Sequence, residues 1–455
     1  MMVVSASAAS YNNLTDKDEI VNKDAVSMLV SLGIIEGKPD GSYGPTEMLT
    51  APRWRRCISV IMNKGVDNSA LYQSVNSGLV DVNTNWAKGH INYCYTTGII
   101  AGRGNGKFDP SATVTALEAA KMLLVAVGYD PAIEGFEGAD WAINVSVRAD
   151  EQGIFEGFTK DLSAPLNRDD AALLIYNALD VEMIQSYTTN NYPIAYSDHR
   201  TILADKYGVI KVQGVVVANE WASLASDDGD AALKEGKTTI YNGEGIFSTT
   251  GNTTVSKEDA SLKTQTFNVS TPVDMLGKTV NLYIKKTTIL ADSTVYGDPV
   301  VSDVNTVVTT GETVLYSGAK DPQVDYDKLL GENGLTDKDA KYFWNYNSGK
   351  YIPNTTEKYG DKTANVKGAT LTIIDNNGDG EVDYVLSVEK ALADITSVNS
   401  KKETVTVRTL GTLDNKDVVG YEDMAKEDVV LYVQYGGRTY LEKPTVSLAR
   451  WSTST

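Results

Sequence analysis

The sequence contains one short run whose side chains have the types and spacing of a metal-binding loop. It reads Asp-Asn-Asn-Gly-Asp-Gly-Glu-Val-Asp and offers oxygen atoms at positions 1, 3, 5 and 9, a backbone carbonyl at position 7 and glycine at position 6. Hard cations such as calcium prefer oxygen ligands in this arrangement. The candidate calcium ligands are Asp375, Asn377, Asp379, Glu381 and Asp383.

A second interpretation of this run needs no metal. Position 12 is Leu386, so the bidentate glutamate that usually closes a calcium loop is missing. The flanking residues 369–374 and 382–386 have the composition of strands, and Asn-Gly and Asp-Gly pairs favour hairpin turns. The run is therefore either a calcium loop between two strands or a polar hairpin.

Few residues elsewhere suit enzyme chemistry. The chain has two histidines and contains no P-loop, no Gly-x-Ser-x-Gly and no His-Glu-x-x-His motif. These absences predict a protein that is not an enzyme. A glycosidase with paired carboxylates stays open as an alternative, because nothing singles out a pair among 60 acidic residues.

Composition limits the partners of the 455-residue chain. Its 60 acidic and 41 basic residues give a net charge of −19, which disfavours nucleic acid and anionic membranes as partners. No stretch has the 18 or so apolar residues of a membrane span. Cys57 and Cys94 lie at apolar helical positions, as buried free thiols or as one disulfide.

One pattern occurs three times between residues 24 and 180. Each copy has an apolar helical run, then Gly-Ile-Ile/Phe-x-Gly, a polar loop and a second apolar helix. The copies span about 14–65, 80–128 and 135–182, and their glycine pairs are Gly33 and Gly37, Gly98 and Gly102, Gly153 and Gly157. Such repetition indicates one structural unit used several times.

The second helix of each copy begins at a residue that can cap it. These residues are Thr50, Thr115 and Asn167. Thr115 and Glu118 form a Thr-x-x-Glu capping box, and Asp170 follows Asn167 by three positions. Two short helices cannot bury an apolar stripe alone, so we expect the copies to pack around a common centre.

Together these motifs are similar to those of a known family. Asp-Val-x-x-x-Trp before a first helix, Gly-Ile-Ile-x-Gly, an aromatic-x-Pro loop and the Thr-x-x-Glu helix start all occur. Residues 14–185 thus resemble the triplicate S-layer homology domain, and residues 128–144 resemble its clostridial-type members. The resemblance implies a pseudo-three-fold helical module that binds secondary cell-wall polysaccharide, which is often pyruvylated.

The family's ligand motif is Thr-Arg-Ala-Glu at the start of the second helix. A helix N-terminus and a guanidinium together suit a carboxylated sugar. The third copy has Asn-Arg-Asp-Asp, so the resemblance singles out Arg168, whereas the second copy has Ala116 and the first has Arg53 out of place. The candidate polysaccharide ligands are Thr50, Arg53, Trp86, Thr115, Glu118, Trp141, Asn167, Arg168 and Asp170. Helix capping is the alternative role of Thr115, Glu118, Asn167 and Asp170, and core packing that of the two tryptophans.

After residue 185 the composition favours strands and turns. Valine, threonine and tyrosine become frequent, and runs such as 209–217, 280–284 and 404–408 are typical strands. We therefore expect a multidomain protein, α followed by all-β. Its β-rich, barrel- or sandwich-like domains would span 190–310, 311–393 with the Asp-rich loop, and 394–455.

The chain ends add two expectations. Residues 1–13 resemble a signal-peptide remnant or a disordered terminus, with Ala6-Ser7-Ala8 in the form of a cleavage site, and the last domain looks truncated. The whole then predicts a secreted, non-catalytic bacterial protein at the cell wall, held on secondary cell-wall polysaccharide in an S-layer or display role, with self-assembly as a further expectation. The alternative is an anchored extracellular enzyme or adhesin that acts on carbohydrate.

Overall fold

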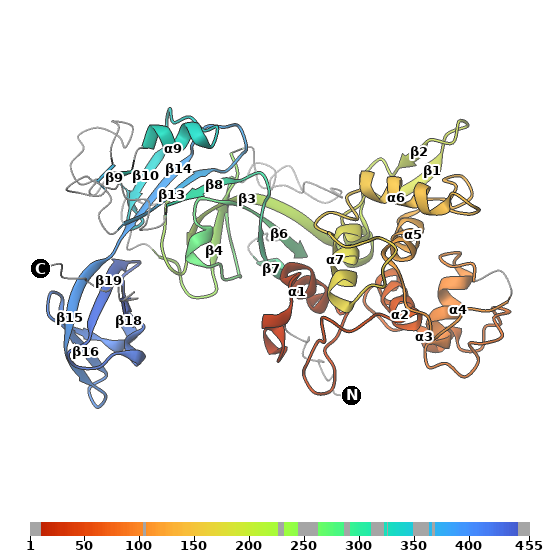
Figure 1. The fold of residues 1–455 in the computed structure, drawn as a ribbon, viewed down its shortest axis with the longest axis horizontal. Coiled ribbons are helices and arrows are strands. Elements are labelled where there is room, and N and C mark those ends of the chain that lie inside the picture. The colour runs from red at the N-terminus through yellow and green to blue at the C-terminus, as the bar shows by residue number, and fades with distance from the viewer. Residues whose placement is uncertain are drawn as a thin grey trace, which may run out of the picture. The chain divides into compact units, whose positions relative to one another are not determined.

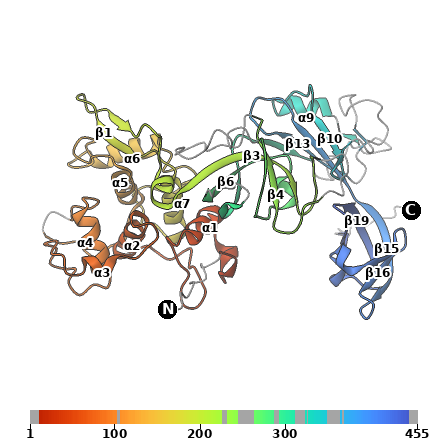
Figure 2. The same ribbon diagram turned by 180° about the vertical axis from the view of Figure 1, so that it is seen from behind.

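The described residues form two compact units. The computed structural model describes residues 11–102, 106–225, 232–243, 263–285, 292–310, 323–324, 326–348, 364–365 and 369–444. The first unit holds the described residues up to Gln213 and those between Leu282 and Val300. The second holds those of 214–243, 263–281 and 301–444 (Figures 1 and 2).

The first unit is helical in all three copies. Its helices are α1 (Lys23–Ser31), α2 (Ala51–Met62), α3 (Ser69–Tyr72), α4 (Lys88–Thr96), α5 (Ala116–Val127), α6 (Trp141–Glu151) and α7 (Arg168–Leu179). Two short 3-10 helices, Tyr11–Asn13 and Lys17–Glu19, precede them, and a hairpin of β1 (Ile184–Tyr187) and β2 (Pro193–Ala195) follows. The predicted two-helix order of each copy is confirmed.

Local chemistry accounts for where these helices begin. The Thr115 hydroxyl accepts from the Glu118 N–H and the Glu118 carboxylate from the Thr115 N–H, both at 3.2 Å, so the capping box is confirmed. Asn167 Oδ1 accepts from the Asp170 N–H at 2.7 Å. Thr50 occupies the N-cap position of α2, but its side chain makes no capping bond within the described part.

Backbone hydrogen bonds join the three cap regions in a closed cycle. The Leu49 N–H donates to the Leu166 carbonyl at 2.8 Å, the Leu166 N–H to the Val114 carbonyl at 2.8 Å, and the Val114 N–H to the Leu49 carbonyl at 3.2 Å. Each of these buried residues stands directly before a cap. One continuous apolar core runs through all three copies, so none of them buries its stripe alone.

The first unit extends beyond the repeats. Ser27 on α1 donates to Asp298 at 3.2 Å, and Ser31 accepts from the Gly297 N–H at 3.0 Å. Tyr176 on α7 bonds to Tyr283 at 3.0 Å. A fragment that ends at residue 185 would lose these contacts, so tests of the module are best made on the full chain.

The remaining elements that the structure describes are mainly strands, in four sheets. One sheet has the order β5-β4-β3-β6-β7, with β3 (Val209–Asn219), β4 (Thr238–Tyr241), β5 (Thr264–Phe267), β6 (Thr279–Lys285) and β7 (Thr294–Val301). A π-helix, Leu203–Tyr207, precedes it. The expected strands at 209–217 and 280–284 are confirmed.

The other sheets belong to the second unit. The order β11-β10-β14-β13-β8 is built from β8 (Thr306–Thr309), β10 (Lys341–Trp344), β11 (Asn347–Ser348), β13 (Ala369–Asp375) and β14 (Tyr384–Glu389), with α9 (Tyr326–Glu332). β9 (Gln323–Val324) pairs with β12 (Ala364–Asn365). The last sheet, β17-β16-β15-β19-β20-β18, comprises β15 (Ala391–Asn399), β16 (Thr404–Val407), β17 (Gly411–Asp414), β18 (Val418–Val419), β19 (Val429–Tyr435) and β20 (Arg438–Glu442).

The predicted combination of helices and β-rich regions is therefore confirmed in outline. Most strand pairs are antiparallel, but β10 with β14 and β18 with β20 are parallel, which the composition did not indicate. The division at residues 185, 310 and 393 and the barrel- or sandwich-like form stay predictions. The predicted signal remnant lies mostly outside the described residues, as do residues 445–455.

Candidate anion-binding groove

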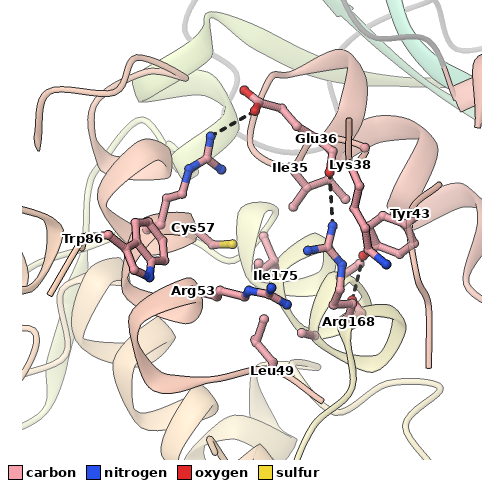
Figure 3. A pocket seen from close by; sticks show the side chains of 14 residues that line it. Ile35, Glu36, Lys38, Tyr43, Leu49, Arg53, Cys57, Trp86, Arg168 and Ile175 are labelled. Carbon is pink, nitrogen blue, oxygen red and sulfur yellow. Dashed lines mark hydrogen bonds and ion pairs between the residues drawn. The ribbon is translucent and has the colours of Figure 1, made fainter. Parts of the chain in front are cut away.

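A groove of about 270 Å³ lies where the three copies meet in the first unit (Figure 3). Most of its residues come from the first copy, with Trp86 from the second and the start of α7 from the third. They are Ile35, Glu36, Gly37, Lys38, Tyr43, Leu49, Arg53, Arg56, Cys57, Trp86, Arg168, Ala171, Ala172 and Ile175. Four of these side chains are cationic, in a chain whose net charge is −19. The groove therefore favours an anionic ligand.

Arg168, the first residue of α7, is held in this groove through its backbone and its side chain. Its N–H donates to the Glu47 carbonyl at 2.9 Å, and its carbonyl accepts from the Tyr43 hydroxyl at 2.7 Å. The guanidinium lies 4.7 Å from the centre of the Tyr43 ring and donates to the Glu36 carbonyl at 3.1 Å. Its buried Nε has no hydrogen-bond partner among the described residues, so donor capacity is left over.

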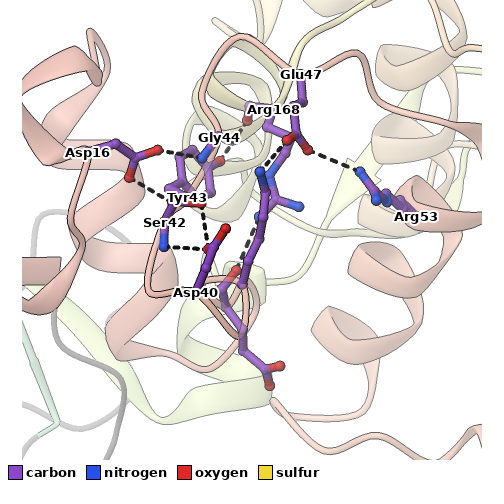
Figure 4. Close-up of polar contacts among 10 residues, drawn as sticks. Asp16, Asp40, Ser42, Tyr43, Gly44, Glu47, Arg53 and Arg168 are labelled. Carbon is purple, nitrogen blue, oxygen red and sulfur yellow. Dashed lines mark hydrogen bonds and ion pairs between the residues drawn. The ribbon is translucent and has the colours of Figure 1, made fainter.

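Tyr43 in turn is fixed by Asp16 (Figure 4). The two carboxylate oxygens of Asp16 accept from the Tyr43 and Gly44 N–H groups, each at 2.7 Å. Burial alone would raise the pKa of Asp16, but these hydrogen bonds together lower it below its usual value. Burial raises the pKa of Tyr43 far above 10, so its hydroxyl stays a neutral donor to Arg168.

Asp16 was not among the residues that the sequence singled out. A signal for it exists, because Asp81 in the second copy accepts from the Phe108 and Asp109 N–H groups at 2.8 Å each. Both aspartates precede the first residue that they hold by 27 positions. Comparing the copies for a shared acid, rather than for shared helix starts, would have found this positioning residue.

The other three cations of the groove have carboxylate partners. Arg53 and Lys38 both pair with Glu47, the former at 3.5 Å. Arg56 pairs with Glu36 at 3.3 Å. Among the groove's described cations, Arg168 alone has a backbone carbonyl and an aromatic ring as its partners.

The two predicted tryptophans have different surroundings. Trp86 is 59% exposed and lines the groove, so it is not a core residue, and its ring lies 6.3 Å from that of His90. Trp141 is half-buried and packs against the core, and the Lys121 ammonium lies over its ring, 5.7 Å from the ring centre. Core packing therefore describes Trp141 better than Trp86.

The structure brings together only some of the predicted polysaccharide ligands. Arg53, Trp86 and Arg168 line the groove. Asn167 and Asp170 line a separate hollow, where Lys160 donates to Asp170 at 2.5 Å. The residues that line neither are Thr50, Thr115, Glu118 and Trp141. Contact of each with polysaccharide stays a prediction.

Cys57 lies in the same groove, and Cys94 is buried on α4. Both are free thiols, so of the two expected arrangements the structure has the free thiols and not the disulfide. Burial raises the pKa of both, to about 12 for Cys94, so neither is a ready nucleophile.

The Asp-rich loop joins β13 to β14, between strands as its flanks indicated. Asp375 is almost fully buried and accepts from the N–H groups of Asn377, Gly378 and Gly380 at 2.7–3.1 Å. Asp379 accepts from the Glu381 N–H at 2.7 Å. Among the described residues, no group of three or more His, Cys, Asp or Glu side chains is arranged to hold a metal ion. The hairpin interpretation accounts for these contacts.

Calcium binding by the loop stays a prediction. Burial raises the pKa of Asp383, and the charges of Asp375 and Asp379 add to the rise, so a bound cation would stabilise the loop. If the prediction is right, calcium titrated into the full chain gives heat and raises the melting temperature, and Asp379→Asn removes both effects. The exposed Asp423 serves as the control, through Asp423→Asn. If the wild type gives no heat and no thermal shift, the calcium prediction is wrong and only the hairpin interpretation stands.

Helical repeats with a cationic groove, followed by sheets, define a repeat-built helical module and β-rich parts. Comparison with known proteins agrees with this. Residues 13–50 and 80–120 match the family model of the S-layer homology domain. The chain therefore carries S-layer homology domains, as its motifs indicated. The third copy lies outside the two matched ranges, although its helices and cap follow the same order.

The similar proteins include cell-surface proteins of bacteria. The chain is 26% identical over 253 residues to a cell surface protein of Thermoanaerobacter kivui, covering 54% of this chain and 30% of that protein. It is 26% identical over 230 residues to the middle cell wall protein of Brevibacillus brevis, covering 50% and 21%. An amylopullulanase of Thermoanaerobacterium thermosulfurigenes is 30% identical over 172 residues, covering 35% and 9%.

These findings support a location at the cell wall or cell surface. The chain spans less than a third of the length of the relatives described above. No helix among the described residues has both the length and the apolar character needed to cross a membrane.

Proposed function

We propose that the three copies form one module with pseudo-three-fold symmetry, which anchors a non-catalytic surface protein to anionic cell-wall polysaccharide. The cycle of hydrogen bonds through Leu49, Val114 and Leu166 supports the symmetry, because equivalent residues make equivalent contacts. The shared core supports a single module.

The observation that carries the proposal is the guanidinium of Arg168. It lies in a groove with an exposed tryptophan, and its buried Nε has no hydrogen-bond partner among the described residues. Unlike the other three groove cations, it forms no ion pair within 4 Å in the described part of the chain, although its charge contributes to lowering the pKa of Glu47. A planar guanidinium suits a carboxylate, and an exposed indole suits the apolar face of a sugar. A sugar that carries a pyruvate ketal offers both groups at once.

The β-rich second unit then provides the outward part of the protein, in an S-layer or display role. Self-assembly of the chain belongs to the same proposal.

Retention on wall sacculi tests this function. The full chain should sediment with sacculi that carry their secondary polysaccharide and stay in the supernatant with sacculi from which hydrofluoric acid has removed it. Equal retention on both would overturn the proposal.

A second candidate function is an anchored enzyme or adhesin. The similarity to an amylopullulanase favours it, although the chain covers only 9% of that enzyme. Release of reducing sugar from the bound polymer would support this candidate against the non-catalytic one.

A further inference from the structure

The cations of the groove divide into two kinds. Lys38 and Arg53 converge on the carboxylate of Glu47 from two sides, whereas Arg168 faces a ring and a backbone carbonyl. Figure 4 shows Glu47 between Arg53 and the loop that carries Gly44. Glu47 itself does not line the groove, but both of its ion-pair partners do. Two of the four groove cations thus share one acidic side chain of the same chain.

The position of Glu47 is built into the loop. Its N–H donates to the Gly44 carbonyl at 3.1 Å, and its own carbonyl accepts from the Arg168 N–H at 2.9 Å. A Cβ at Gly44 would lie 2.6 Å from Lys38 Nζ and 2.9 Å from the carboxyl carbon of Glu47. The ion pair therefore lies directly over a residue without a side chain, whose φ of +72° also favours glycine.

The surroundings of Glu47 favour the charged form of its carboxylate. The hydrogen bond from Lys38 holds the pKa of Glu47 below its usual range. Its side chain is 41% exposed, so water can solvate the carboxylate when its partners leave it. A partner of this kind can be exchanged without leaving a buried charge alone.

We propose that Glu47 is an internal competitor of the ligand, a carboxylate that occupies Lys38 and Arg53 until an acidic sugar displaces it from them. The proposal rests on the function proposed above and adds how the same groove selects its ligand. Arg168 supplies the first contact, and the exchange at Lys38 and Arg53 supplies the second. A neutral sugar has no carboxylate to replace that of Glu47 at Lys38 and Arg53, so the exchange favours acidic sugars over uncharged ones.

The test compares Glu47→Gln with the wild-type full chain by calorimetry. The probes are a methyl hexoside that carries a pyruvate ketal and its methyl ester, which has the same shape without the charge. Because exposed ion pairs contribute up to about 1 kcal/mol, the variant should bind the acid about threefold to fivefold more tightly. The affinity for the ester should be the same in Glu47→Gln and in the wild type.

A matched variant shows whether the gain in affinity belongs to Glu47 itself. Glu137→Gln makes the same change of charge at an exposed site outside the groove and should leave affinity unchanged. If the wild type binds the acid and Glu47→Gln binds it equally or more weakly, the competitor role is wrong while the anchoring function stands. If the acid binds neither protein, and wall retention fails as well, the proposed function itself is wrong.

Discussion

Replacement of Arg168 by alanine is expected to release the full chain from wall sacculi. The guanidinium is the groove cation that keeps donor capacity for a ligand, and charge-assisted hydrogen bonds contribute about 1.5–3 kcal/mol each. Affinity should therefore fall about tenfold to a hundredfold. Co-sedimentation over a range of protein concentrations measures this loss.

Two further variants show whether the loss is specific. Arg168→Lys keeps the charge but not the planar fork that lies against Tyr43, so its affinity should be intermediate. Arg408→Ala removes an exposed arginine of the second unit and should leave retention unchanged. Full retention of Arg168→Ala, with an unchanged melting temperature, would remove Arg168 from the site.

Trp54→Ala is expected to destabilise all three copies together. Trp54 is fully buried in the core that the copies share, and truncation of such a side chain costs about 3–5 kcal/mol. Denaturant titration followed by hydrogen exchange should show α2, α5 and α7 losing protection at one lowered denaturant concentration.

Trp86→Ala is the matched control, because this tryptophan is 59% exposed. It should change the free energy of unfolding by less than about 0.5 kcal/mol and should weaken wall retention. If Trp54→Ala unfolds α2 while α5 and α7 keep their protection, the copies are independent, and the single module is excluded.

The sequence was sufficient for the features that depend on local chemistry. The Thr115–Glu118 capping box and the Asn167 cap follow from residues three positions apart, and the structure contains both. Helices with an apolar stripe are similarly local, because their period is set by a few consecutive turns.

Contacts between distant segments could not be predicted in this way. The hydrogen bonds among Leu49, Val114 and Leu166 use backbone groups, which every residue has, so no side chain marks them. The bond from Ser27 to Asp298 spans 271 positions and places part of the β-rich sequence in the first unit. Such contacts form only when distant segments of the chain pack together in the tertiary structure.

The candidate site likewise has one residue that its local motif identifies and two whose roles depend on distant contacts. Arg168 was singled out by its resemblance to the arginine of the family's ligand motif at a helix start, whereas Glu47 and Asp16 lie in loops whose roles depend on what folds beside them. Glu47 becomes important because Lys38 and Arg53 both reach it, and Asp16 because it holds the N–H groups beside Tyr43.

Hydrogen exchange of the wild-type full chain, with and without the pyruvate-ketal methyl hexoside, tests the central claim most directly. If acidic sugar binds where the three copies meet, protection should rise in residues 35–57, around Trp86 and in residues 168–175. Protection confined to residues 369–444, or none in the first unit at a concentration that saturates binding, would contradict the account.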